Sequence, residues 1–129
     1  MARLAYLDAS AFVKLVLEEP ESHALELAAE RWPWTASALL EVEVAIAVRR
    51  RDPRRVDAAR ALLAGVTMLD IDPGVRAAAS SFHSLRTLDA IHLATALSLG
   101  HHVDTLFTYD DRLIDAARAH GLTVSVPRP

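Results

Sequence analysis

The alternation of apolar and polar segments along the chain predicts strands that alternate with helices. The four apolar residues Leu4–Leu7 are too few for a helix and predict a buried strand, which Asp8 ends. Further strands are predicted at 34–36, 66–71, 105–108 and, at an edge, 122–126. Strands separated by helical segments of about ten residues indicate an α/β fold, with a mostly parallel sheet and helices on both of its faces.

Periodic apolar positions between these strands predict helices, and capping residues mark their ends. The expected N-caps are Ser37, Asp52, Asp72 and Thr87. After Asp52 and Asp72, a proline stands at the first helical position, where proline is favoured. His101 and His102 follow the Gly100 stop and are expected in a loop. The predicted helices cover about 11–17, 21–31, 38–50, 53–64, 73–82, 88–99 and 111–120.

Length and composition limit the class of protein. With 129 residues, 52% of them hydrophobic and 24% charged, the chain fits one globular domain over 1–129. It has no apolar run near the ~18 residues of a membrane span, and Met1 to Arg3 leave no room for a signal peptide, so we expect a cytosolic protein without membrane contact. The absence of cysteine excludes disulfides, thiolate metal sites and cysteine nucleophiles.

The basic residues are unevenly distributed although the net charge is -3. Five arginines lie between Arg49 and Arg55, where Asp52 and Pro53 interrupt them. A solvated helix end explains such a run, and so does a surface that contacts phosphate or a protein partner.

Three aspartates are expected at one edge of the sheet. Asp8 and Asp110 each follow a predicted strand, and parallel strands end at a common edge, where open α/β sheets bind ligands. Asp89 lies in the first turn of a helix that should begin at that edge. Each aspartate alone is also explained as a turn or capping residue, and Asp111 competes with Asp110 as the cap of the next helix.

Helical spacing separates two glutamates on the helix that follows Ser37. Glu41 and Glu43 lie about 200° apart, so only one can point into a site at the edge of the sheet. Glu43 shares its face with apolar residues at 39, 40, 46 and 47, which predicts that it points inward. The alternative is a glutamate whose carboxylate reaches the rim of that face.

Four carboxylates on rigid elements suit Mg²⁺ or Mn²⁺ better than zinc. His92, three residues after Asp89, is expected to pack or to hydrogen-bond near the site rather than to bind metal. The sequence has no His-x-x-x-His pair, no Gly-x-Ser-x-Gly elbow and no phosphate-binding glycine loop.

Four segments together resemble the PIN-domain family, and specifically the VapC-type toxins of prokaryotic toxin-antitoxin pairs. The segments follow the family's order and span the chain: Tyr6-Leu7-Asp8-Ala9-Ser10, then Ser37 to Glu43 with Ala47 to Arg50, then Leu85 to Ala94, and finally Phe107 to Leu113. The sequence departs from the family at Ile46, where relatives often carry an arginine.

The resemblance implies a single PIN-like domain and a Mg²⁺-dependent endoribonuclease. Its acidic quartet would be Asp8, Glu43, Asp89 and Asp110, which would bind the metal. Ser10 and Thr108 would orient the ligands, and Arg86 and Arg112 would contact phosphate. The family also implies an RNA substrate, a cognate antitoxin that covers the site and a homodimer.

Three other classes of protein are alternatives to a PIN-domain nuclease. A receiver-like phosphoacceptor domain requires a lysine near the site, but Lys14 is the only lysine and lies in the first predicted helix. A haloacid-type phosphatase requires a second aspartate two residues after Asp8, where Ser10 stands. The stronger rival is a catalytically inactive PIN-like module that binds RNA or protein, against which the presence of all four acids argues.

Overall fold

One parallel sheet organises the chain. The computed structural model describes residues 3–129 and contains five strands in the order β3-β2-β1-β4-β5, so the first strand lies at the centre. All four strand pairings are parallel. The strands are β1 (Leu4–Leu7), β2 (Trp34–Ser37), β3 (Val66–Leu69), β4 (Val103–Phe107) and β5 (Val124–Ser125).

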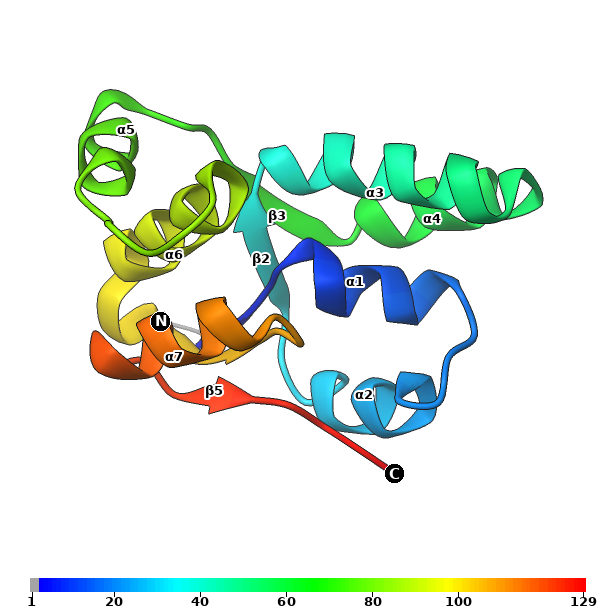
Figure 1. Cartoon of the computed structure of the whole chain (residues 1–129). Coiled ribbons are helices and arrows are strands. Elements are labelled where there is room, and N and C mark those ends of the chain that lie inside the picture. The colour runs from blue at the N-terminus through cyan, green and yellow to red at the C-terminus, as the bar shows by residue number, and fades with distance from the viewer. Residues whose placement is uncertain (1–2) are drawn as a thin grey trace.

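Helices cover both faces of the sheet, as predicted. The chain runs from β1 to one edge through β2 and β3, then crosses back to β4 and β5 on the other side of β1. Right-handed crossovers in opposite directions place their helices on opposite faces, and Figure 1 shows α1 to α4 on one side of the strands and α5 to α7 on the other. The helices are α1 (Ala9–Val16), α2 (Ser22–Ala29), α3 (Leu39–Arg51), α4 (Val56–Leu63), α5 (Pro73–Ser80), α6 (Thr87–Leu99) and α7 (Asp111–Ala119).

The predicted elements all occur, but several ends differ. Helix α1 begins at Ala9, two residues early, because the Asp8 carboxylate accepts the N–H of Ala11 and caps it. The helix predicted after Asp52-Pro53 starts with a 3-10 turn, Pro53–Arg55, before α4. His101 and His102 belong to another 3-10 turn, Gly100–His102, rather than to a loop.

Two predicted N-caps are wrong. Ser37 is the last residue of β2, and the N-cap of α3 is Ala38, although the Ser37 hydroxyl still accepts the N–H of Leu39 at 3.2 Å. Thr87 is the first residue of α6, and Arg86, which has extended backbone, is its N-cap. Residue type alone does not fix a helix start, which also depends on how far the preceding strand or extended segment continues. Asp52 and Asp72 cap as predicted, by accepting the N–H of Arg54 and Val75.

The core lies around β1. Ala5, Tyr6 and Leu7 are fully buried between the two helical layers, as expected for a central parallel strand. No helix within residues 3–129 has the length and hydropathy to span a bilayer. The prediction that the N-terminus carries no signal peptide rests partly on Met1 and Ala2, which lie outside the described residues.

Candidate active site

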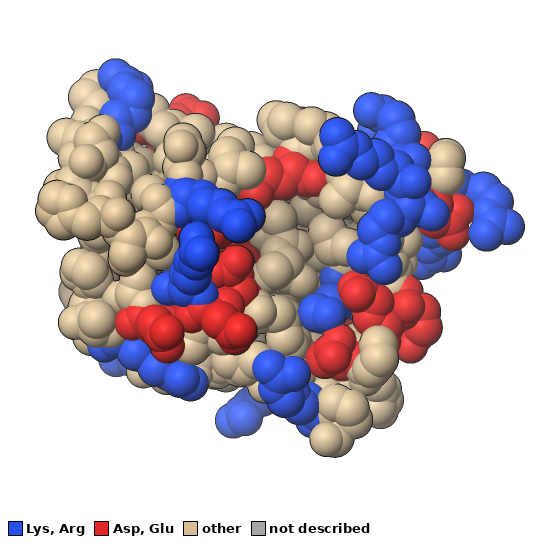
Figure 2. Space-filling view, in the orientation of Figure 1, with Lys and Arg blue, Asp and Glu red and all other residues tan. Residues whose placement is uncertain are grey.

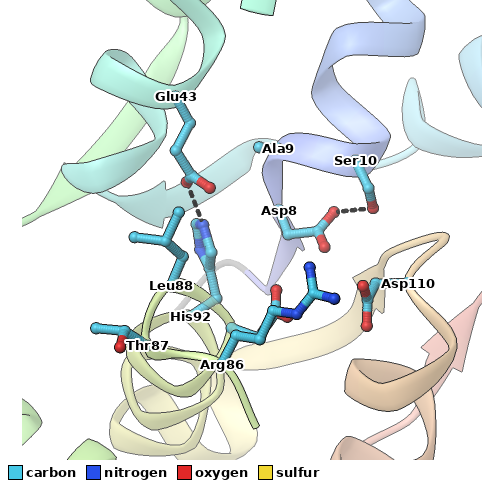
Figure 3. A pocket seen from close by; sticks show the side chains of 10 residues that line it. Asp8, Ala9, Ser10, Glu43, Arg86, Thr87, Leu88, His92 and Asp110 are labelled. Atoms are coloured by element: carbon cyan, nitrogen blue, oxygen red, sulfur yellow. Dashed lines mark hydrogen bonds and ion pairs between the residues drawn. The ribbon is translucent and has the colours of Figure 1, made fainter. Parts of the chain in front are cut away.

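A pocket of about 480 Å³ lies beyond the carboxyl ends of β1 and β4. The chain leaves β1 and β4 toward helices on opposite faces, and such a reversal opens a crevice at the edge of an α/β sheet. All four predicted acidic residues line this pocket, each from a different element: Asp8, Glu43, Asp89 and Asp110. Figure 3 shows this site with Ser10, Arg86 and His92, which also line it.

Asp8 is the most deeply buried of the four acids. It is 2% exposed, and its carboxylate accepts hydrogen bonds from Ser10 Oγ at 2.7 Å, from Thr108 Oγ1 at 2.6 Å and from the N–H of Ala11 at 3.0 Å. Burial raises the pKa of Asp8, and the hydrogen bonds from Thr108 and Ser10 oppose that rise. The carboxylate is therefore held in one orientation at the carboxyl end of β1.

Ser10 and Thr108 join the ends of β1 and β4. The Ser10 hydroxyl accepts the N–H of Tyr109 at 2.9 Å and lies 3.3 Å from Thr108 Oγ1, which accepts the N–H of Asp110 at 3.1 Å. Both hydroxyls thus hold the Asp8 carboxylate and the backbone that follows β4. They also fix the backbone from which Asp110 projects.

Asp110, and not Asp111, caps α7. Asp110 Oδ1 accepts the N–H of Leu113 at 2.9 Å, whereas Asp111 is the first helical residue and is exposed. The alternative in which Asp111 is the cap is therefore wrong. The reason is geometric, because the backbone of Asp110 is still extended and that of Asp111 is already helical.

Asp89 lies in the first turn of α6 and faces the other carboxylates. Partial burial raises its pKa, and the negative charges of Asp110 and Asp8 raise it further. The positive end of the α6 dipole favours the ionised form of the same carboxyl. The four acids therefore repel one another in the pocket.

Glu43 points into the pocket and Glu41 does not. The Glu43 side chain is 16% exposed, whereas Glu41 is exposed and lines a separate hollow beside Arg60. The prediction that Glu43 points inward is confirmed, but the buried face of α3 is not the one from which it was predicted. The buried stripe of α3 is Leu40, Val44 and Val48, and Ile46 is 46% exposed.

His92 is buried and hydrogen-bonded, as predicted. It is 1% exposed, and its Nε2 lies 2.6 Å from Glu43 Oε1, the contact drawn in Figure 3. Its Nδ1 lies 2.7 Å from the hydroxyl of Tyr6. Sequence reasoning missed Tyr6, for which the available signal was a tyrosine in a buried strand two residues from Asp8.

The two predicted phosphate contacts differ in position. Arg86 lines the pocket, and Figure 3 shows its guanidinium pointing toward Asp8 and Asp110. Arg112 is exposed in the first turn of α7 and is not among the residues that line the pocket.

The donor set of the pocket fits a hard divalent cation. Carboxylate oxygens are the ligands that Mg²⁺ prefers, and a cation would relieve the repulsion that raises the pKa of Asp89. Within residues 3–129, no three acidic or histidine side chains are gathered closely enough to hold a metal ion as they stand. The fit is therefore one of donor type and charge, and binding requires the side chains to draw together.

Comparison with known proteins identifies the family. The model of the PIN domain matches residues 5–119. A curated relative from Mycobacterium tuberculosis strain H37Rv, Ribonuclease VapC46, is 45% identical over 125 residues, which cover 95% of this chain and 96% of the relative.

Two solved structures share the fold. Mycobacterium tuberculosis VapC20, described as a sarcin-ricin loop cleaving toxin, superposes with a TM-score of 0.75 at 18% identity and covers 97% of this chain and 99% of that one. A chain of a toxin-antitoxin complex from Klebsiella pneumoniae superposes with a TM-score of 0.74 at 20% identity, covering 95% of this chain and 97% of that one.

The raised pKa of Asp89 predicts how pH affects stability in EDTA. A carboxyl whose pKa is raised by folding stabilises the fold fully below its ordinary value of 3.8, and that contribution is lost as the pH rises through its folded pKa. Asp89→Asn should therefore have a higher free energy of unfolding than the parent at pH 7. The difference should shrink as the pH falls toward 3.8, measured by urea unfolding across this range.

The matched control is Asp111→Asn, which removes an exposed first-turn carboxylate from α7. It should leave stability unchanged or slightly lower, because only the interaction with the helix dipole is lost. An Asp89→Asn variant whose advantage over the parent is absent or independent of pH would contradict the prediction.

Proposed function

The chain belongs to the PIN domain family, and on this premise we propose that it is an endoribonuclease acting as the toxin of a toxin-antitoxin pair. The observation that carries the proposal is the convergence of Asp8, Glu43, Asp89 and Asp110 on one pocket. The similarity to a ribonuclease over nearly the whole of both chains supports it. An inactive binding module has no need of four mutually repelling acids, so the enzyme is the better explanation.

We propose that the four carboxylates hold Mg²⁺, for which Mn²⁺ can substitute. When bound, the ion would supply an activated water and stabilise the charge that develops on phosphate oxygens. Asp8 already uses part of its acceptor capacity, with three hydrogen bonds for about four lone-pair sites. Glu43 Oε1 lies 2.6 Å from His92 Nε2, so Oε2 would be the oxygen that binds the ion.

Arginines beside the pocket would bind the phosphate backbone of RNA. The chain has a net charge of -3, so attraction of RNA must come from local positive charge rather than from the whole molecule. Arg86 lines the pocket, which supports a contact between its guanidinium and the phosphate that would be cleaved. Arg112, on the neighbouring turn of α7, would contact a flanking phosphate.

The proposed partners are an antitoxin and a second copy of the chain. A structural neighbour is part of a toxin-antitoxin complex, which supports an antitoxin as partner, and the family resemblance implies that the antitoxin would cover the pocket. The homodimer rests on the family resemblance, and the mass of a single chain in light scattering would contradict it. Because the proposed substrate is RNA, we expect the chain to act in the cytoplasm.

Cleavage is expected to depend on the divalent ion. The purified chain, freed of antitoxin, should cleave single-stranded or loop RNA with Mg²⁺ or Mn²⁺ and stop when EDTA is added, because the four carboxylates of the pocket require a cation to bind and activate a water. Gel analysis of a labelled RNA measures this. Cleavage by a clean preparation that persists in EDTA would contradict the metal proposal.

The second experiment compares RNA cleavage after substitution of acids inside and outside the pocket. Glu43→Gln should lower the cleavage rate by about 100-fold or more, whereas Glu41→Gln, the matched control on the same helix, should retain most activity because its side chain is outside the pocket. Asp110→Asn should inactivate equally, and its amide still caps α7, so the fold should survive. An inactive Glu41→Gln with an active Glu43→Gln would show that the site is wrongly built.

The five arginines between Arg49 and Arg55 differ in whether their side chains have partners within the chain. Arg51 lies 3.6 Å from Glu19, Arg54 pairs with Asp52, and Arg55 donates to the carbonyl of Val16, so these three have partners inside the chain. Arg49 and Arg50 are exposed, and their side chains make no ion pair or hydrogen bond within residues 3–129. Figure 2 shows basic side chains gathered over this end of α3, at the right of the view.

We propose that Arg49 and Arg50 bind RNA phosphates outside the pocket. Replacing both with glutamine should weaken RNA binding and reduce the slope of log affinity against log salt by about 1 to 2. Fluorescence anisotropy at several salt concentrations measures the slope. The control replaces two other exposed arginines, Arg118 and Arg128, and an equal loss in both variants would contradict a local contact.

A further inference from the structure

The hydroxyl of Tyr6 lies beneath the pocket without lining it. Tyr6 is fully buried in β1, and its ring meets that of His92 edge to face, with centroids 5.8 Å apart. Side chains alternate along a strand, so Tyr6 and Asp8 project to the same face. One strand thus carries a pocket carboxylate and, one position deeper, a phenol hydroxyl that contacts His92.

Counting protons assigns a direction to the hydrogen bonds of this hydroxyl. The backbone N–H of Ser37 lies 3.0 Å from the Tyr6 oxygen and can only donate, so the oxygen accepts there. His92 Nδ1, at 2.7 Å, is then the acceptor for the Tyr6 proton. Among the hydrogen bonds of residues 3–129, the Tyr6 hydroxyl has only these two partners, and the nearby Thr95 hydroxyl bonds instead to the carbonyl of Ile91 at 2.7 Å.

The other side of the His92 ring requires the same assignment. If Nδ1 of a neutral ring carried the proton, Nε2 would be an acceptor 2.6 Å from the carboxylate oxygen of Glu43, and two acceptors would face each other. If both nitrogens carried protons, Nδ1–H and the N–H of Ser37 would both donate to the Tyr6 oxygen, and the Tyr6 proton would have no acceptor among the hydrogen bonds of residues 3–129. A neutral ring with its proton on Nε2 donates to Glu43, accepts from Tyr6 and satisfies every group.

Glu43 depends on this donor more than the other acids depend on theirs. Asp8 and Asp110 cap helices, and Asp89 lies in a first turn, so free N–H groups and a helix dipole stabilise each of them. Glu43 lies beyond the first turn of α3, where the backbone N–H groups already bond within the helix. Its one hydrogen bond within residues 3–129 comes from His92.

We propose that Tyr6 is a positioning residue for Glu43, which it holds through His92. By donating to Nδ1, Tyr6 fixes the proton of the imidazole on Nε2 and the orientation of the ring. The ring then holds Glu43 Oε1 and leaves Oε2 directed into the pocket. The proposal rests on the proposed function for the meaning of that orientation, but the hydrogen-bond arrangement itself can be tested without RNA.

The first experiment measures the tautomer of His92 in the unmodified, metal-free chain at neutral pH. Nitrogen-15 NMR of the ring distinguishes a proton on Nε2, a proton on Nδ1 and protons on both. A neutral ring protonated on Nε2 is expected. A proton on Nδ1, with or without one on Nε2, would overturn the proposal.

The second experiment removes one hydroxyl from either of two tyrosines. Tyr6→Phe should weaken Mn²⁺ binding by about 10-fold, the scale on which loss of a group that orients a ligand acts, and a fraction of His92 should move its proton to Nδ1. The matched control, Tyr109→Phe, removes a hydroxyl that donates to the carbonyl of Pro127 at 2.7 Å, away from His92, and should bind Mn²⁺ as the parent does. Equal Mn²⁺ affinity in Tyr6→Phe and Tyr109→Phe would overturn the proposal.

Activity separates this inference from the proposed function. When the RNA concentration is varied, Tyr6→Phe should lower kcat and leave KM nearly unchanged, since Tyr6 is buried and does not reach RNA. If no form of the chain cleaves RNA while the tautomer and Mn²⁺ results hold, the proposed function fails and the positioning role stands. If the parent cleaves RNA and Tyr6→Phe has the same kcat, the positioning role fails alone.

Discussion

Repulsion among four carboxylates at one edge of the sheet is the constraint on which the local structure depends. Burial and like charge raise the pKa of Asp89, and burial raises that of Asp8. The fold offsets this cost by directing three helix N-termini, those of α1, α6 and α7, at the acids. The same helices follow or precede the strands that end there, so the topology that gathers the charges also supplies the groups that stabilise them.

The convergence of the acids was predictable because it follows from topology. Parallel strands end at a common edge, and the observed register pairs Leu7 with Phe107, which brings Asp8 beside Thr108. Helical spacing was enough to separate Glu43 from Glu41, even though the exposed Ile46 shows that the buried face of α3 is centred elsewhere. The two glutamates lie about 200° apart on the helix. They therefore remain on different sides even when the predicted centre of the buried face is wrong by one residue.

Details that depend on contacts between distant segments were not predictable. Tyr6 and His92 are 86 residues apart, and the sequence predicts for each only that it lies in a buried strand or helix. The N-caps at Ser37 and Thr87 were assigned from residue type, but β2 continues through Ser37 because that residue pairs with Leu69 of β3. Local preference decides such ends only when no neighbouring strand extends the pairing.

The short strand β5 determines how copies of this domain can associate. An edge strand exposes unpaired backbone groups to which another chain can add. Here the edge next to β4 has only Val124–Ser125, Pro127 follows at once without an N–H to offer, and the Tyr109 hydroxyl occupies its carbonyl. Addition of a further strand is therefore disfavoured at this edge, and of the five strands in residues 3–129 it is β3, at the opposite edge of the sheet, that remains open to pairing with another chain.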